Sequence, residues 1–227
     1  MVNAMQSNSF RTLKHTLSWL YVWGIAFGYI EAATVIYLRK IYYPDGYIFP
    51  IILADIDIAS VEIMRELMTL IIILAVAELT FRTFLKKLAA YMIIFGIWDI
   101  FYYIFLKIYL DWPESFFTWD ILFLIPFPWV GPVMAPLLVS LSLIYAGIVI
   151  LVKMNRGYHF QFDKKFWIME IIAIIIIIIP FIISGSVDIN QTIPPSFPWI
   201  IFLAGLFFGL VVFHYYLVKG SNVLSNP

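Results

Sequence analysis

Three acidic residues, Glu31, Glu66 and Asp99, lie inside stretches of apolar sequence long enough to cross a membrane. An ionisable side chain at membrane depth costs about 2.5–3.5 kcal/mol on insertion scales, so it persists only where it is paired, neutralised or useful. Clustered carboxyl groups could act as general acid and base, or could carry a proton or a cation. Glu31, Glu66 and Asp99 are therefore the candidate catalytic residues.

Glu31 lies beside a row of small residues, Gly24, Gly28 and Ala32, at four-residue spacing. Small residues at this spacing let two membrane helices approach closely. At about 100° per residue, Glu31 falls in the same sector of the helix as this row, so we expect it to face protein rather than lipid. The structural alternative is a protonated glutamate that is hydrogen-bonded across a helix interface.

A second polar group, Glu62, Arg65, Glu66 and Thr69, has spacings that place all four side chains on one helix face. Glu62 and Glu66 form a like-charge pair that is unfavourable unless something neutralises it. Arg65 suits that role, because its guanidinium group pairs with carboxylates in a bidentate manner. The alternative is an interfacial ion pair at a helix start, which explains Glu62 better than the deeper Glu66 and Thr69.

Asp99 lies near the middle of its apolar stretch, and Tyr103 follows one turn later on the same face. We expect Tyr103 to donate its hydroxyl group to Asp99. At 1.5 Å per residue, the three candidate acids occupy a slab about 10 Å thick, which indicates one shared pocket. The predicted substrate-binding residues are Glu62, Arg65, Thr69, Tyr103, Trp119, Asp120 and Trp129.

The elements that must position these residues are membrane-spanning helices. The chain of 227 residues is 63% apolar and 12% charged, whereas a soluble domain carries about 25% charged residues. This composition excludes soluble, disordered and nucleic-acid-binding proteins. We predict an all-α, polytopic integral membrane helix bundle, a single transmembrane domain over residues 1–227, with six spans at about residues 17–38, 61–81, 88–108, 133–152, 166–184 and 199–218.

The basic residues predict which side each end of the chain occupies. With the N-terminus inside, ten Lys and Arg residues fall on the inner side, and only Arg39, Lys40 and Lys107 fall on the outer side. An excess of Lys and Arg marks the cytoplasmic loops of membrane proteins. We therefore expect a multi-pass protein of the cell (inner or plasma) membrane with both termini in the cytoplasm.

The segment before the fourth span is unusual, because the apolar run from residue 116 to residue 152 is too long for one span. Proline removes a backbone donor and clashes with the preceding turn, so the prolines here must interrupt a helix. We predict a short outer helix in residues 109–132, re-entrant in one interpretation, followed by a bend into the fourth span. The interrupting residues are Pro126, Pro128, Gly131, Pro132 and Pro136.

The function predicted first is the binding or transformation of a lipid-like or small molecule at an outward-facing intramembrane carboxylate and arginine site. A proton- or cation-coupled transporter and a structural or accessory subunit are the alternatives. The sequence has no P-loop, Rossmann, nucleophile-elbow or HExxH motif, so whether the site is enzymatic stays open. We predict no cofactor and no protein-bound metal, although a divalent cation bound by the carboxylates remains an open alternative. We expect the lipid bilayer as the partner and no binding to nucleic acid.

Overall fold

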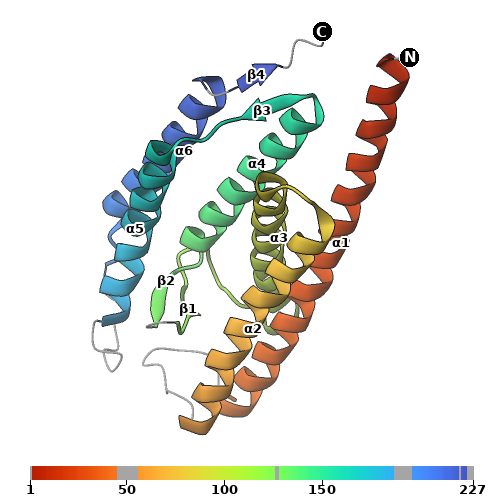
Figure 1. The fold of residues 1–227 in the computed structure, drawn as a ribbon. Helices are drawn as coiled ribbons and strands as arrows, with labels where there is room; N and C mark the ends of the chain where they lie inside the picture. The colour runs from red at the N-terminus through yellow and green to blue at the C-terminus, as the bar shows by residue number, and fades with distance from the viewer. Residues whose placement is uncertain (1, 45–55, 126–127, 187–195, 220, 224–227) are drawn as a thin grey trace.

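The computed structural model describes residues 2–44, 56–125, 128–186, 196–219 and 221–223 of the chain. Among the described residues, six helices alternate in direction along the chain, and four short strands form two antiparallel pairs (Figure 1). The helices are α1 (Val2–Tyr42), α2 (Ile56–Thr80), α3 (Phe84–Leu110), α4 (Met134–Asn155), α5 (Lys164–Ser186) and α6 (Trp199–Lys219). The strands are β1 (Trp119–Phe123), β2 (Trp129–Pro132), β3 (Tyr158–Phe160) and β4 (Ser221–Val223).

Five of these helices are long and apolar enough to cross a membrane: α1 over Arg11–Tyr42, α3, α4, α5 and α6. The sequence predicted six spans, and the one that is not among these five, at residues 61–81, corresponds to α2. That helix has 25 residues, but its first half contains Asp57, Glu62, Arg65 and Glu66. The predicted helical membrane bundle is confirmed by the five apolar helices, whereas the number six stays a prediction.

Helix α3 lies at the centre of the bundle and packs against α1, α2 and α4. Two glycines allow this close packing. A Cβ atom added at Gly28 of α1 would lie 2.8 Å from the carbonyl oxygen of Trp98, and one added at Gly96 of α3 would lie 2.6 Å from that of Ser140. A side chain could relieve such a clash by changing its rotamer, but a backbone oxygen cannot. Only glycine therefore fits at these two helix contacts.

Residues 119–125 and 128–132 differ from the sequence prediction. The predicted short outer helix is wrong: β1 and β2 form an antiparallel hairpin in which Asp120 faces Gly131. Proline cannot continue a helix, and strand pairing satisfies the backbone groups that the broken helix would leave free. Helix α4 then begins at Met134, with Pro136 in its first turn, where proline is tolerated. Pro126 lies outside the described residues.

The hairpin rests on the C-terminal end of α5. A Cβ atom added at Gly185 would collide with the carbonyl oxygen of Pro128, and one added at Gly131 would lie 2.9 Å from the ring of Phe181. The start of α1 and the end of α6 lie at the opposite end of the bundle from this hairpin (Figure 1). The hairpin therefore marks one end of the helix bundle, and the start of α1 marks the other.

Candidate functional site

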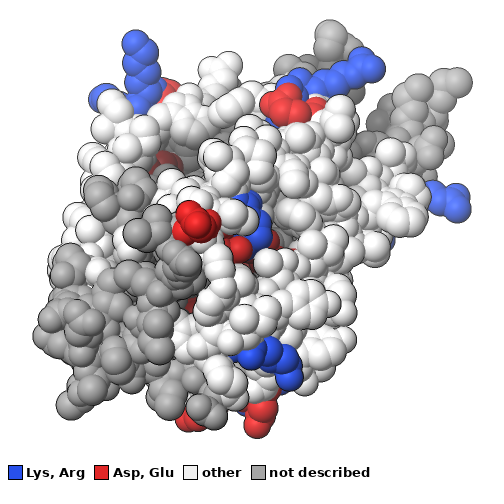
Figure 2. Space-filling model, turned by 90° about the horizontal axis from the view of Figure 1, so that it is seen from below, with Lys and Arg blue, Asp and Glu red and all other residues white. Residues whose placement is uncertain are grey.

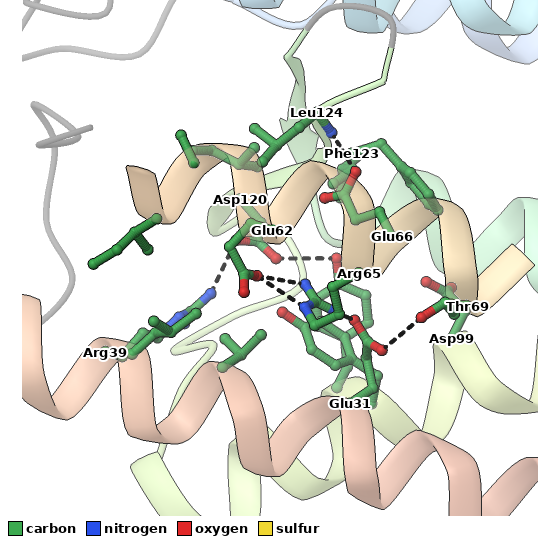
Figure 3. A pocket seen from close by; sticks show the side chains of 18 of the residues that line it. Glu31, Arg39, Glu62, Arg65, Glu66, Thr69, Asp99, Asp120, Phe123 and Leu124 are labelled. Atoms are coloured by element: carbon green, nitrogen blue, oxygen red, sulfur yellow. Dashed lines mark hydrogen bonds and ion pairs between the residues drawn. The ribbon is translucent and has the colours of Figure 1, made fainter. Parts of the chain in front are cut away.

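A cavity of about 200 Å³ lies at the hairpin end, between α1, α2, α3 and β1 (Figure 3). Viewed from this end, acidic and basic side chains gather near the middle of a largely uncharged face (Figure 2). Five carboxyl groups and two guanidinium groups line the cavity: those of Glu31, Glu62, Glu66, Asp99 and Asp120, and those of Arg39 and Arg65. Acidic groups therefore outnumber basic groups in this cavity.

Arg65 joins two acids from different helices. Its Nε and Nη2 atoms both donate to Oε2 of Glu62, at 2.9 and 2.7 Å, because the two residues are one turn apart on α2. Its Nη1 atom forms an ion pair with Oε1 of Glu31 on α1. The second oxygen of Glu31 accepts a hydrogen bond of 3.2 Å from the hydroxyl group of Thr69. Both carboxylate oxygens of Glu31 thus contact side chains of α2.

Glu66 connects α2 to the hairpin, and Arg65 acts on it electrostatically without an ion-pair contact. Its Oε2 atom accepts a hydrogen bond of 2.8 Å from the backbone N–H of Leu124, just after β1. No ion pair involves Glu66 within the described ranges of the chain. This carboxyl group is therefore held in place by a neutral donor and still faces the cavity (Figure 3).

Asp99 lies deeper, at the contact of α3 with α4. Its Oδ2 atom accepts a hydrogen bond of 2.7 Å from the hydroxyl group of Ser140, and both side chains are buried. The close approach at Gly96 brings the two helices near enough for this bond. Asp99 also has no ion pair in the part of the chain that the structure describes.

Asp120 of β1 is the best-enclosed acid of the site. Its Oδ1 atom lies 3.0 Å from Nη2 of Arg39, and its Oδ2 atom accepts a hydrogen bond of 3.2 Å from the hydroxyl group of Tyr103. The guanidinium group of Arg39 lies over the ring of Trp112, 3.7 Å from its centroid, in a cation–π contact. Burial raises the pKa of Asp120, while Arg39 and Tyr103 act in the opposite direction.

The structure brings eight of the ten predicted site residues to the lining of this one cavity: Glu31, Glu62, Arg65, Glu66, Thr69, Asp99, Tyr103 and Asp120. Trp119 and Trp129 lie elsewhere. The ring of Trp119 packs edge-on against Phe197, and the ring of Trp129 stacks on Phe181. Because side chains alternate along a strand, Asp120 turns to the cavity and Trp119 turns to the aromatic cluster beside α5 and α6.

One expectation about a partner is corrected by the geometry, and one residue of the site was not predicted from the sequence. Tyr103 donates to Asp120 rather than to Asp99, because β1 brings a closer acceptor to its hydroxyl group. Arg39, which the sequence indicated only as an outer charge, is a buried member of the site with 7% of its surface exposed. No local pattern marks Arg39, since its partner Asp120 lies 81 residues further along the chain.

Among the described residues, no group of three or more His, Asp or Glu side chains is arranged to hold a metal ion. The acids of the cavity bind arginine, hydroxyl or backbone N–H groups instead. The carboxyl groups of Glu66 and Asp99 could each pair with a cation in the cavity or carry a proton.

The molecule is a multi-pass helical membrane protein with a cavity at one end whose lining includes seven charged side chains. Comparison with protein-family models, with curated proteins and with solved structures finds no match to this chain. The function is therefore argued from the geometry of the cavity.

Proposed function

We propose that this protein crosses the cell membrane six times, with both termini in the cytoplasm and the hairpin end outside. Five helices are apolar enough to span, and α2, at about 1.5 Å per residue, has a length that matches a bilayer. The alternating helices bring ten Lys and Arg residues to the end where α1 begins. They are Arg11, Lys14, Arg82, Lys86, Lys87, Lys153, Arg156, Lys164, Lys165 and Lys219.

The function that this cavity supports best is the binding of a small molecule or lipid headgroup that carries a positive charge. One observation supports it most directly: five carboxyl groups face two guanidinium groups, and Glu66 and Asp99 have only neutral hydrogen-bond donors. A cationic ligand would supply the missing charge. A buried charge is stabilised only when it is paired and hydrogen-bonded.

The other walls of the cavity suit an ammonium group. Trp98, Tyr102 and Tyr103 line it, and aromatic faces attract amines and quaternary ammonium ions. A volume of about 200 Å³ is small beside the roughly 300–1,000 Å³ of pockets for drug-sized ligands. The ligand class is therefore a small amine or an ammonium headgroup, with the acyl chain of a lipid lying outside the cavity.

If the site also transforms its ligand, Glu66 and Asp99 are the better candidates for proton transfer. Glu31 is occupied on both oxygens, by Arg65 and by Thr69, and acts as a positioning group in this arrangement. Glu66 and Asp99 each accept a single neutral hydrogen bond among the described contacts. Each therefore keeps one carboxyl oxygen without a partner among the described contacts, and that oxygen can exchange a proton with a ligand.

Titration calorimetry on the full chain in a non-ionic detergent tests the binding proposal. Choline and ethanolamine are the cationic probes, and glycerol and acetate are the neutral and anionic ones. We expect only the cations to bind, and we expect Glu66→Gln and Asp99→Asn to weaken choline binding about tenfold, since each removes a charged partner. Glu78→Gln is the matched control, because Glu78 lies at the other end of α2 and pairs with Lys87.

Two results would reject the binding proposal. One is equal binding of glycerol and choline. The other is choline binding that Glu66→Gln and Asp99→Asn leave unchanged, in which case a structural role for these acids would be the better explanation. A structural role also predicts that Asp99→Asn is tolerated or stabilising, because it removes a buried charge.

Proton- or cation-coupled transport is the second candidate, and the positions of the acids favour it. Glu66 faces the cavity, while Asp99 lies deeper, between α3 and α4 and bonded to Ser140. Acids in series from a cavity mouth toward the membrane interior are typical of proton relays. The test is choline uptake into sealed vesicles containing the protein, with and without a pH gradient. Uptake that follows the gradient and is lost in Asp99→Asn would favour transport over binding alone.

A further inference from the structure

A second cavity, of about 290 Å³, lies at the opposite end of the bundle, between α1, α3 and α4. It shares no lining residue with the cavity at the hairpin. Its polar side chains are those of Thr12 and Thr16 on α1, Lys86 on α3 and Asn155 on α4. Its apolar walls are Leu13, Phe81 and Leu151.

Among the residues that the structure describes, Lys86 is the only charged side chain that lines this second cavity. It is half-buried, and no carboxylate of the described residues lies within ion-pair distance of its ammonium group. The neighbouring Lys87 differs, because it is paired with Glu78. A partly desolvated ammonium group without a carboxylate partner favours an anion in the adjoining cavity.

The neutral groups around Lys86 can complete an anion site. The hydroxyl group of Thr16 donates to the backbone carbonyl of Thr12 at 3.0 Å, a local bond that a hydroxyl group can exchange for a stronger one to a charged oxygen. Thr12 and Asn155 also line this cavity, and both already take part in other interactions. A lysine beside an exchangeable hydroxyl group suits a ligand with several charged oxygens, and phosphate is such a ligand.

The basic residues around the second cavity also favour an anionic ligand. Arg11, Arg82, Lys153 and Arg156 lie at this end of the bundle and add to its positive potential. Basic pockets between membrane helices on the cytoplasmic side are typical sites for anionic lipid headgroups. The apolar walls could also contact the glycerol or upper acyl part of a lipid.

We propose that this second cavity binds a phosphate group, with Lys86 as the cation that pairs with it. The group belongs either to the headgroup of an anionic phospholipid in the adjoining leaflet or to free phosphate. The proposal does not depend on the ligand of the cavity at the hairpin, and the two can fail separately.

The test measures binding of two probes to the full chain in a non-ionic detergent by titration calorimetry. Inorganic phosphate reports the free anion, and a short-chain phosphatidylglycerol below its micelle concentration reports the headgroup. Short-chain phosphatidylcholine, which carries a compensating positive charge, is the lipid control. Lys86→Gln removes the charge in the cavity, and Lys87→Gln removes the same charge from the next residue. Thr16→Leu keeps Lys86 but fills part of the cavity.

We expect at least one of phosphate and phosphatidylglycerol to bind, with about tenfold weaker binding in Lys86→Gln and in Thr16→Leu and little change in Lys87→Gln. Binding of phosphatidylglycerol alone identifies a lipid site, and binding of phosphate identifies a free-anion site. Equal losses in the two lysine variants would show a diffuse surface charge and overturn the proposal. Binding of neither probe, or phosphatidylcholine binding as tight as phosphatidylglycerol binding, would also overturn it. Unchanged elution and melting of each variant verify that it is folded.

Discussion

Arg39 and Asp120 form a buried ion pair, 3.0 Å apart, between the last turn of α1 and the first strand of the hairpin. Their side chains are 8% and 2% exposed. Because the pair joins segments 81 residues apart, it attaches the hairpin to the helix bundle at the rim of the cavity. The hydroxyl group of Tyr103 and the ring of Trp112 complete its environment.

Removing one partner of this pair should destabilise the protein strongly. Asp120→Asn leaves the guanidinium group of Arg39 buried without its anion, which typically costs about 3–5 kcal/mol. We expect the midpoint of thermal unfolding in detergent to fall by roughly 6 °C or more. Combining Arg39→Met with Asp120→Leu should recover most of the loss, since no buried charge then remains.

Asp111→Asn is the matched control for that experiment. Asp111 lies at the same end of the bundle and pairs with Lys107, but its side chain is 93% exposed, so solvent screens the pair. We expect little change in its unfolding midpoint. If Asp120→Asn is no more harmful than Asp111→Asn, the ion pair does not attach the hairpin in the way described.

The hydrogen bond from Leu124 to Glu66 predicts how the hairpin responds to changes in α2. Glu66→Ala removes the acceptor, so the amide hydrogen of Leu124 should exchange with solvent about tenfold faster. Glu66→Gln keeps a carbonyl acceptor and should retain most of the protection. Hydrogen exchange followed by mass spectrometry over residues 119–125 measures both effects.

The pair of Glu66 variants also separates structure from ligand binding. Glu66→Gln should keep the hairpin in place and still weaken binding of choline, whereas Glu66→Ala should affect both. Glu78→Ala, in the same helix and far from the hairpin, is the control. Unchanged exchange at Leu124 in Glu66→Ala would contradict the contact between α2 and the hairpin.

Gly96 should not tolerate even alanine. The added Cβ atom would lie 2.6 Å from the backbone oxygen of Ser140, so α3 and α4 must move apart and strain the bond from Ser140 to Asp99. Such overpacking costs about 1–3 kcal/mol, which thermal unfolding in detergent can measure. Ile108→Ala, at a position 65% exposed on the same helix, should have a much smaller effect. Equal effects of the two changes would argue against the close crossing of α3 and α4.

The absence of cysteine from the sequence makes single-cysteine labelling a direct test of topology. We expect Ser60→Cys, in the first turns of α2, and Glu114→Cys, before the hairpin, to react with a membrane-impermeant maleimide on intact cells. Thr83→Cys, between α2 and α3, should react only after the membrane is made permeable. All three native side chains are exposed.

Labelling also decides whether α2 crosses the membrane, because Ser60 and Thr83 lie at its two ends. Equal reactivity of the two variants on intact cells would show that α2 does not span. Reactivity of Thr83→Cys alone would show that the proposed orientation is inverted.

The sequence by itself determined the helices and the local geometry of the polar groups. Five of the six apolar windows coincide with helices that are long and apolar enough to span, because a bilayer imposes a minimum length of apolar sequence. The spacing of Glu62 and Arg65 placed both on one face of α2, and their pair in the structure follows from the helical repeat alone. The row of Gly24, Gly28 and Ala32 likewise marked the face of α1 that packs against α3.

Only the tertiary structure decided which partner each acid has. Arg39 with Asp120, Leu124 with Glu66 and Ser140 with Asp99 each join segments far apart in the chain. The hairpin itself, which the apolar and proline-rich sequence suggested would be a short helix, depends on the pairing of β1 with β2 and on packing against α5. The physical reason is that helical spacing and hydropathy act over a few turns, whereas a buried charge is satisfied by whichever group the packed helices bring to it.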